Sequence, residues 1–193
     1  MEDLIKLYLN SGRALTEYQL NKLNINQLKT YYQRRKLAVT FVEWQDYEKS
    51  KLRDLILDDV EYQKTIINQD PDNFEFIIEE LYEEGKIPYD IQMTAIKKDG
   101  NYIDYLKHFF PEGEVPYEMQ LAAVQSKGDA IRYVKLLYKK NELPQELMRA
   151  AITNDVEAIL RIDNPPKEIK KFAEKMILKV FGRIPGLYAK FIY

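Results

Sequence analysis

Apolar residues recur along this chain at the three- and four-residue spacing of amphipathic α-helices, and no segment of useful length alternates like a β-strand. In the N-terminal region Leu28, Tyr31, Tyr32 and Leu37 follow this spacing and predict one helix. The apolar positions between residues 41 and 68 predict one long helix or two. Helical patterning continues through the chain and indicates an all-α protein.

A repeat of 28 residues occupies the middle of the chain. Segment 88–93, PYDIQM, returns almost unchanged at 116–121 as PYEMQL, and more loosely at 144–148 as PQELM. An alanine stands seven positions after each proline, and a β-branched residue follows it; the alanines are Ala95, Ala123 and Ala151. A fixed period of this length is typical of stacked supersecondary units.

The expected unit is a helix, a short turn, a second helix and a loop that leads to the next proline. Proline suits the first turn of a helix, where its missing N–H is not needed. Alanine lets two helix backbones approach closely. Gly100 and Gly128 predict a left-handed turn between the paired helices, whereas the third copy has Asp155 and Val156 at this turn.

These patterns predict an all-α, solenoid-like array of antiparallel helix pairs with an N-terminal helical subdomain. The subdomain covers residues 1–70, the 28-residue repeats cover 71–165, and a capping helix with an apolar tail covers 166–193. We expect the tail to pack on the body of the protein or on a second subunit, which makes a homodimer one expected assembly.

The best-preserved unit resembles a known repeat. Its pattern is Leu121-x-Ala123-Val124-x-x-x-Gly128-x-Ala130-Ile131-x-x-Val134. This is similar to an uncharacterised α-helical repeat family of bacterial, viral and protist proteins, whose unit reads Leu-x-Ala-Val-x-x-Asn-Gly-x-Ala-Leu-x-x-Val. The resemblance covers about residues 73–165 and implies an α-helical array. The family has no assigned catalytic residues to transfer, and this chain has Lys127 and Asp99 where the family has asparagine.

The inventory of reactive side chains argues against an enzyme. The chain has no cysteine, and His108 is its one histidine, so the usual zinc sets and cysteine-based dyads are excluded. The sequence after Asp70 lacks the glycine of a calcium loop. We predict no cofactor and no metal. A carboxylate enzyme that uses Asp58 or Asp59 is the third and weakest hypothesis.

Charge is strongly segregated along the chain although the net charge is only −2. Residues 54–90 carry twelve acidic and two basic side chains, whereas residues 1–53 carry six acidic and ten basic ones. The acidic segment predicts a surface that docks on a basic partner. Its candidate residues are Asp58, Asp59, Glu75, Glu79, Glu80 and Glu83.

Two basic segments favour an alternative function, RNA binding. Cations beside aromatic rings can contact phosphates and stack on unpaired bases, and lysines at four-residue spacing form a row along one helix face. The first segment supplies Lys29, Tyr31, Tyr32, Arg34, Arg35 and Lys36, and the second supplies Lys167, Lys171, Lys175 and Lys179.

The leading hypothesis is a non-enzymatic protein that docks on a macromolecular partner. The small size and the Lys-, Asn-, Ile- and Tyr-rich composition resemble accessory proteins of phages with AT-rich hosts. The resemblance implies an inhibitor of a host nucleoprotein defence complex, such as CRISPR interference (an anti-CRISPR protein). Because the sequence shows neither a signal peptide nor a membrane span, we expect a cytoplasmic protein of the host cell with no membrane partner.

Overall fold

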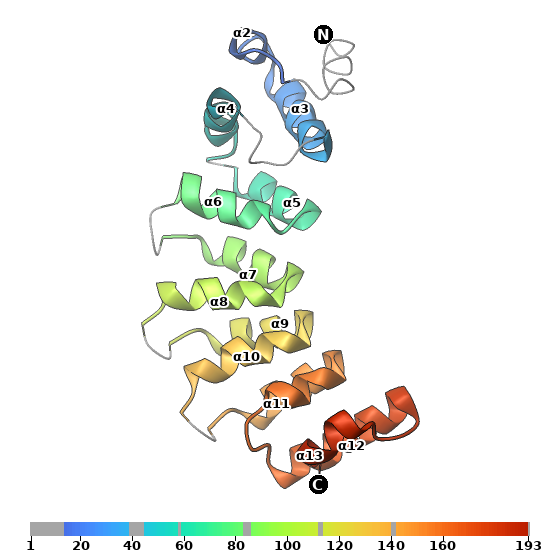
Figure 1. Cartoon of the computed structure of the whole chain (residues 1–193). Helices are drawn as coiled ribbons and strands as arrows, with labels where there is room; N and C mark the ends of the chain where they lie inside the picture. Colours follow the sequence, from blue (N-terminus) through green and yellow to red (C-terminus); the bar gives the residue numbers. More distant parts are fainter. Residues whose placement is uncertain are drawn as a thin grey trace.

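The computed structural model describes the backbone of residues 14–38, 45–57, 59–82, 86–111, 114–139 and 142–192. It describes the side chains in these ranges except those of residues 33–38, 76, 79 and 80. Every regular element within the ranges is a helix (Figure 1), so the prediction of an all-α protein is confirmed. No helix among them is long and apolar enough to cross a membrane.

The described part of the N-terminal region contains α2 (Glu17–Leu20), α3 (Ile25–Ala38) and α4 (Asp46–Ile56). Thr16 begins α2 with a capping box, in which its side chain and that of Gln19 each accept the other's backbone N–H. Leu20, Tyr31 and Ile56 are among the side chains that fill the core between these helices.

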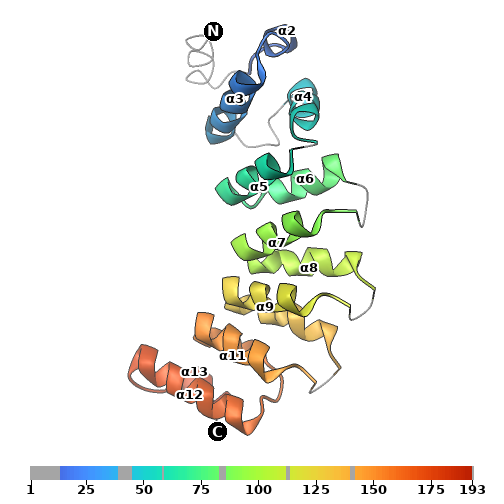
Figure 2. The same cartoon turned by 180° about the vertical axis from the view of Figure 1, so that it is seen from behind.

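The remaining helices lie one after another along the length of the molecule (Figures 1 and 2). The first helices of successive units pack on one another, α5 on α7, α7 on α9 and α9 on α11. Pro88, Pro116 and Pro144 are the N-caps of α7, α9 and α11. The elements are α5 (Val60–Gln69), α6 (Asn73–Leu81), α7 (Tyr89–Lys98), η2 (Gly100–Tyr102), α8 (Ile103–Leu106), η3 (Lys107–Phe109), α9 (Tyr117–Ser126), η4 (Gly128–Ala130), α10 (Ile131–Val134), η5 (Lys135–Leu137), α11 (Gln145–Asn154), η6 (Val156–Arg161), α12 (Lys167–Phe181) and α13 (Gly186–Ile192).

The stack includes one helix more than the proline spacing indicated. α5 begins at Val60, which is 28 residues before Pro88, and it packs on α7 as α7 packs on α9. Ile67 takes the position of the buried alanines and is itself fully buried. Of the one or two helices predicted over residues 41–68, the described part contains α4 and α5. Asp59 starts α5 by accepting a hydrogen bond from the Tyr62 N–H.

Close contact, and not a left-handed turn, explains the two repeat glycines. Among the described glycines only Gly182 has a positive φ, so the prediction for Gly100 and Gly128 is wrong. A Cβ at Gly100 would lie 2.1 Å from the carbonyl oxygen of Ala123, and one at Gly128 would lie 2.6 Å from that of Ala151. The glycine of one unit and the alanine of the next are therefore two sides of a single contact, which we call the Gly–Ala contact.

The last helices leave the 28-residue pattern. Pro166, the N-cap of α12, comes 22 residues after Pro144, and α12 is longer than the helices before it. Gly182 ends α12 in the left-handed conformation at φ 69°, which glycine adopts without steric cost. The chain then turns back into α13.

Candidate functional surfaces

The aromatic half of the first predicted RNA-binding segment is buried. Tyr31 and Tyr32 are at most 3 % exposed. The Tyr31 hydroxyl accepts from the Leu15 N–H at 3.1 Å and donates to Glu48 Oε1 at 2.5 Å, while the Tyr32 hydroxyl donates to the Glu48 carbonyl at 2.9 Å. Burial is the main reason why the pKa of Tyr32 is raised far above its usual value. Both rings belong to the core and are unavailable for base stacking, which corrects that interpretation.

Of the four basic side chains in this segment, the structure describes that of Lys29. The side chains of Arg34, Arg35 and Lys36 lie outside the described residues. Lys29 donates to Asp59 at 2.8 Å, and its ammonium group lies 4.5 Å from the centre of the Tyr62 ring. One candidate of the basic segment thus neutralises one candidate of the acidic segment, in a contact that joins α3 to the start of α5.

The Lys29–Asp59 pair should stabilise the fold in a pH-dependent way. The hydrogen bond from Lys29, followed by that from the Tyr62 N–H, holds the pKa of Asp59 below its usual value. Since this lowers the folded-state pKa, the contribution is complete above about pH 4 and is lost as the pH falls through the folded-state pKa. Asp59→Asn, which keeps the helix cap, should cost less than about 1 kcal/mol at neutral pH. Asp59→Ala should cost about 1 kcal/mol more.

Urea unfolding of both variants at neutral and acidic pH measures these differences. The gap between the wild type and Asp59→Asn should close at acidic pH. A gap that persists there would show that the ion pair does not cause it.

Among the predicted acidic docking residues whose side chains the structure describes, Glu75 opens onto a groove. Asp58 and Glu83 lie outside the described residues, as do the side chains of Glu79 and Glu80. Glu75 is exposed on α6 and lines a hollow of about 350 Å³ together with residues of η2, α8 and η3. We call this hollow the acidic groove; its lining is Glu75, Asp99, Asn101, Tyr102, Asp104, Tyr105 and His108.

Carboxylates in and near the acidic groove act on Tyr102. Burial first, and then the charges of Asp72, Glu75, Asp99 and Asp70, raise the pKa of Tyr102 well above its usual value. Some of this charge is partly compensated within the protein. Asp99 pairs with Lys127 at 3.1 Å and Asp104 with Lys107 at 2.5 Å.

One buried polar atom in the acidic groove has no hydrogen-bond partner among the described residues. Asn101 Oδ1 is buried and accepts no hydrogen bond from the described residues. Of the groove residues, the sequence predicted only Glu75 as a docking residue, because the other lining residues lie outside the acidic segment 54–90.

The second predicted basic segment is placed as a solvent-facing row. Lys167, Lys171, Lys175 and Lys179 are all exposed on α12. Within the described ranges, the one ion pair of this row joins Lys171 to Glu168, at 4.0 Å. α3 and α12 lie at opposite ends of the molecule (Figure 1), so the two basic segments do not form one surface.

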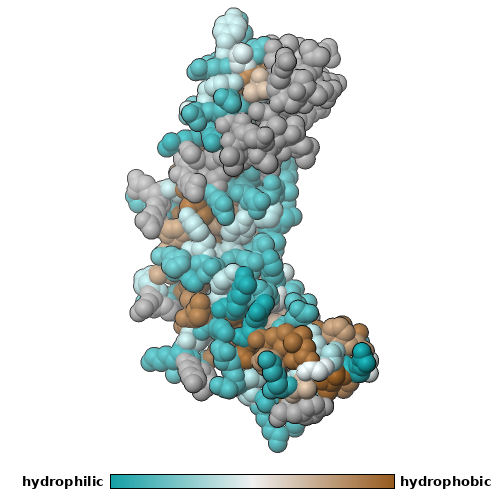
Figure 3. All heavy atoms as spheres, viewed as in Figure 1, coloured by the Kyte–Doolittle hydropathy of each residue, from teal (hydrophilic) through white to brown (hydrophobic). Residues whose placement is uncertain are grey.

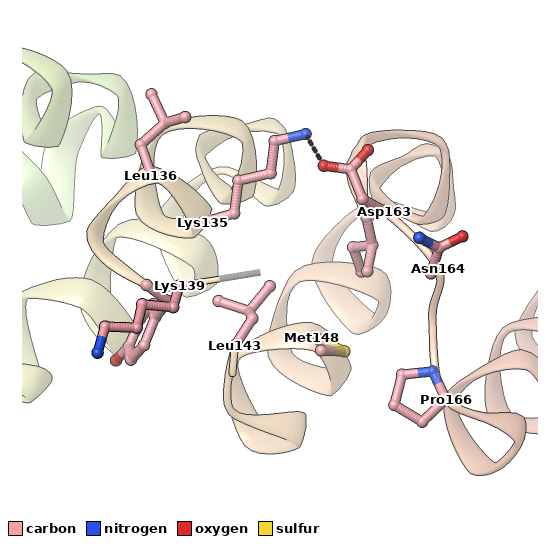
Figure 4. Close-up of a pocket in the computed structure, with 10 residues that line it drawn as sticks. Lys135, Leu136, Lys139, Leu143, Met148, Asp163, Asn164 and Pro166 are labelled. Carbon is pink, nitrogen blue, oxygen red and sulfur yellow. Dashed lines mark hydrogen bonds and ion pairs between the residues drawn. The ribbon is translucent and has the colours of Figure 1, made fainter. Parts of the chain in front are cut away.

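A pocket of about 500 Å³, lined by both apolar and polar side chains, lies between the end of η5, α11 and the segment that leads into α12 (Figure 4). Leu143, Met148 and Pro166 line it, and Lys135 spans one side to reach Asp163 at 2.9 Å. These side chains come from separate elements and carry no sequence motif, which is why sequence reasoning missed the pocket. It can hold an apolar group, and it presents no catalytic arrangement.

Neither metal chemistry nor the carboxylate hypothesis gains support from the described residues. No group of three or more His, Asp or Glu side chains among them could hold a metal ion. Of the two carboxylates in that hypothesis, Asp59 caps α5 and pairs with Lys29. Comparison of the chain with protein-family models, curated proteins and solved structures found no match.

Proposed function

We propose that this chain is a non-enzymatic binding protein whose acidic groove docks on a basic segment of a protein partner. The observation that carries the proposal is the convergence of Glu75, Asp99 and Asp104 on one open hollow flanked by aromatic rings. Complementary charge speeds and orients docking, and tyrosine is favoured at the centre of protein interfaces. Arginine suits such a groove best, because its guanidinium group can pair with carboxylates and stack on a ring.

Regular contacts between the units support this use of the groove. Besides the Gly–Ala contact, hydrogen bonds repeat between units: the Tyr89 hydroxyl donates to Glu118, and the Tyr117 hydroxyl donates to Glu146 at 2.7 Å. The Ser126 hydroxyl donates to the carbonyl of residue 97 at 3.0 Å. A surface that is already ordered loses little conformational entropy on binding.

The more specific form of the proposal is an inhibitor of a host nucleoprotein defence complex. Such complexes bind nucleic acid through basic surfaces, and an acidic groove has the charge to occupy them. Inhibition of CRISPR interference in cells that express the chain would test this form, and a Glu75→Lys variant should lose the inhibition.

Charge reversal at Glu75 should weaken binding of a basic peptide. With a fluorescent oligo-arginine peptide at low salt, we expect Glu75→Lys to raise the Kd about tenfold. Glu114→Lys is the matched control because Glu114 is exposed, lies outside the groove and undergoes the same change in charge. Fluorescence anisotropy measures both. An equal loss in the two variants would show that net charge, and not the groove, binds the peptide.

The alternative function, RNA binding, retains the lysine row of α12 as its described surface. The observation in its favour is that all four lysines of the row are exposed. Tyr31 and Tyr32 no longer contribute to it.

A further inference from the structure

Large apolar side chains are exposed together at the end of α12 and on α13. Figure 3 shows this apolar area on the part of the molecule formed by the two helices. We call it the apolar end patch; its members are Leu178, Val180, Phe181 and Leu187, which are 43 %, 58 %, 46 % and 57 % exposed. Single exposed apolar residues are common on protein surfaces, whereas contiguous groups mark contacts with other proteins or with membranes.

The apolar end patch arises because α12 extends beyond the stripe of residues that it buries. Ile169, Ala173 and Ile177 form the buried stripe of this helix at four-residue spacing. Past Ile177, the apolar residues Leu178, Val180 and Phe181 extend the helix by one more turn and stay 43 %, 58 % and 46 % exposed. The Phe181 ring lies 5.9 Å from the Tyr188 ring of α13, so the exposed turn is held in place by the helix that follows.

Exposed cations alternate with the members of the patch along the sequence. They are Lys175, Lys179, Arg183 and Lys190. None of them forms an ion pair within the described ranges; Lys190 lies over the Phe191 ring at 4.9 Å. Residues 166–193 carry seven basic and two acidic side chains, so the whole region is positively charged.

We propose that the apolar end patch docks on the surface of an anionic lipid bilayer. Phe181, Leu178 and Leu187 would enter the boundary between headgroups and acyl chains, and the exposed cations would contact lipid phosphates. Surface-bound amphipathic helices combine these two features, and their long basic side chains reach outward to the headgroups. The sequence-based expectation of no membrane partner considered spanning segments, which a surface contact does not need.

The charge of the region distinguishes this partner from two others. Two copies of the chain joined patch to patch would bring like charges together, which opposes a symmetric dimer at this site. RNA would satisfy the cations, but phosphate contacts gain nothing from exposed leucine and phenylalanine side chains. An anionic bilayer accommodates both the apolar and the charged side chains. The acidic groove is a different surface, so this proposal does not depend on the proposed function.

Vesicle co-sedimentation of the full chain tests the proposal. We expect binding to vesicles of phosphatidylcholine with an equal part of phosphatidylglycerol, and binding at least about tenfold weaker to phosphatidylcholine alone. Phe181→Ser with Leu187→Ser should lower binding about tenfold. The control is Tyr18→Ser with Ile25→Ser, which removes two comparably exposed apolar side chains at the opposite end of the molecule.

A second pair of variants tests the cations. Lys179→Glu with Arg183→Glu should lower binding to anionic vesicles by more than about tenfold. Lys97→Glu with Lys98→Glu makes the same change in net charge on α7 and should have a much smaller effect. Circular dichroism checks that each variant keeps its helices.

Several outcomes would overturn the proposal. One is a lack of binding to anionic vesicles; another is binding that falls equally with the patch variants and their controls. Self-association that the patch variants abolish, without vesicle binding, would assign the patch to a contact between copies. Retention of RNA that the cation variants abolish, again without vesicle binding, would assign the region to nucleic acid.

Discussion

Gly100→Ala is expected to lower the free energy of unfolding by about 3 kcal/mol. Glycine-to-alanine changes at unstrained positions usually stabilise a protein, because alanine restricts the unfolded chain. Here the new methyl group would lie 2.1 Å from the Ala123 carbonyl oxygen, which belongs to the backbone of the next unit and cannot rotate away. The two units would have to separate, and the packing between α7 and α9 would be lost with them.

Two other glycines provide graded controls for this prediction. Gly128→Ala meets the Ala151 carbonyl oxygen at 2.6 Å and should cost about 2 kcal/mol. Gly186→Ala has open space around the new methyl group and should be neutral or stabilising by up to about 1 kcal/mol. Urea unfolding followed by circular dichroism ranks the three. A Gly100→Ala protein as stable as the wild type would mean that the Gly–Ala contact does not set the distance between units.

The second prediction concerns a buried hydrogen bond that is present in two units and incomplete in a third. Tyr138→Phe should cost about 2 kcal/mol, and Phe110→Tyr should stabilise the protein by about 1 kcal/mol. The Tyr138 hydroxyl donates to Oε1 of buried Gln120 at 2.7 Å, and the Tyr82 hydroxyl donates to Gln63 at 2.8 Å.

The unit between them has Gln92, which lies 28 residues before Gln120 and has no such donor. Gln92 donates to the Ile87 carbonyl at 2.7 Å, as Gln120 donates to the Val115 carbonyl at 2.8 Å. Its Oε1, however, is buried and accepts no hydrogen bond from the described residues. Phe110, 28 residues from both Tyr82 and Tyr138, stands where the donor would be. A hydroxyl at this position would satisfy the glutamine.

Phe109→Tyr is the matched control, because its side chain is also half-buried and it adds the same hydroxyl one position away. It should not stabilise the protein. Urea unfolding measures all three variants. If Phe110→Tyr stabilised the protein no more than Phe109→Tyr, the ring at position 110 would not point to Gln92.

Local sequence patterns were sufficient to predict the helices that follow the three repeat prolines and the spacing of these units. A proline at the first turn and a fully buried alanine seven positions later are short-range features, and both appear where the repeat placed them. α5 was harder to assign to the stack, since Val60 and Ile67 replace the proline and the alanine. Its membership depends on packing against α7, which no local pattern of α5 reveals.

The candidate surfaces depended more on tertiary contacts and were predicted less completely. Tyr31 and Tyr32 look like surface aromatics beside arginines, yet α4 covers them and Glu48 accepts hydrogen bonds from both hydroxyls. The acidic groove joins Glu75 to residues of the following unit, among them Asp99 and Asp104. Counting charges along the chain identifies Glu75 but overlooks Asp99 and Asp104, because segments more than twenty residues apart meet only after folding.

The Gly–Ala contact also bears on how closely one unit can approach the next. Glycine stands at the turn in the units that begin at Pro88 and Pro116, whereas the α5 unit has Asp72 and the unit that begins at Pro144 has Val156 there. The branched side chain would occupy the volume that the next alanine carbonyl needs. After this unit, α12 follows at a shorter spacing instead of adding another equivalent pair. The side chain at this turn is thus a place where a single substitution would change the pitch of the array.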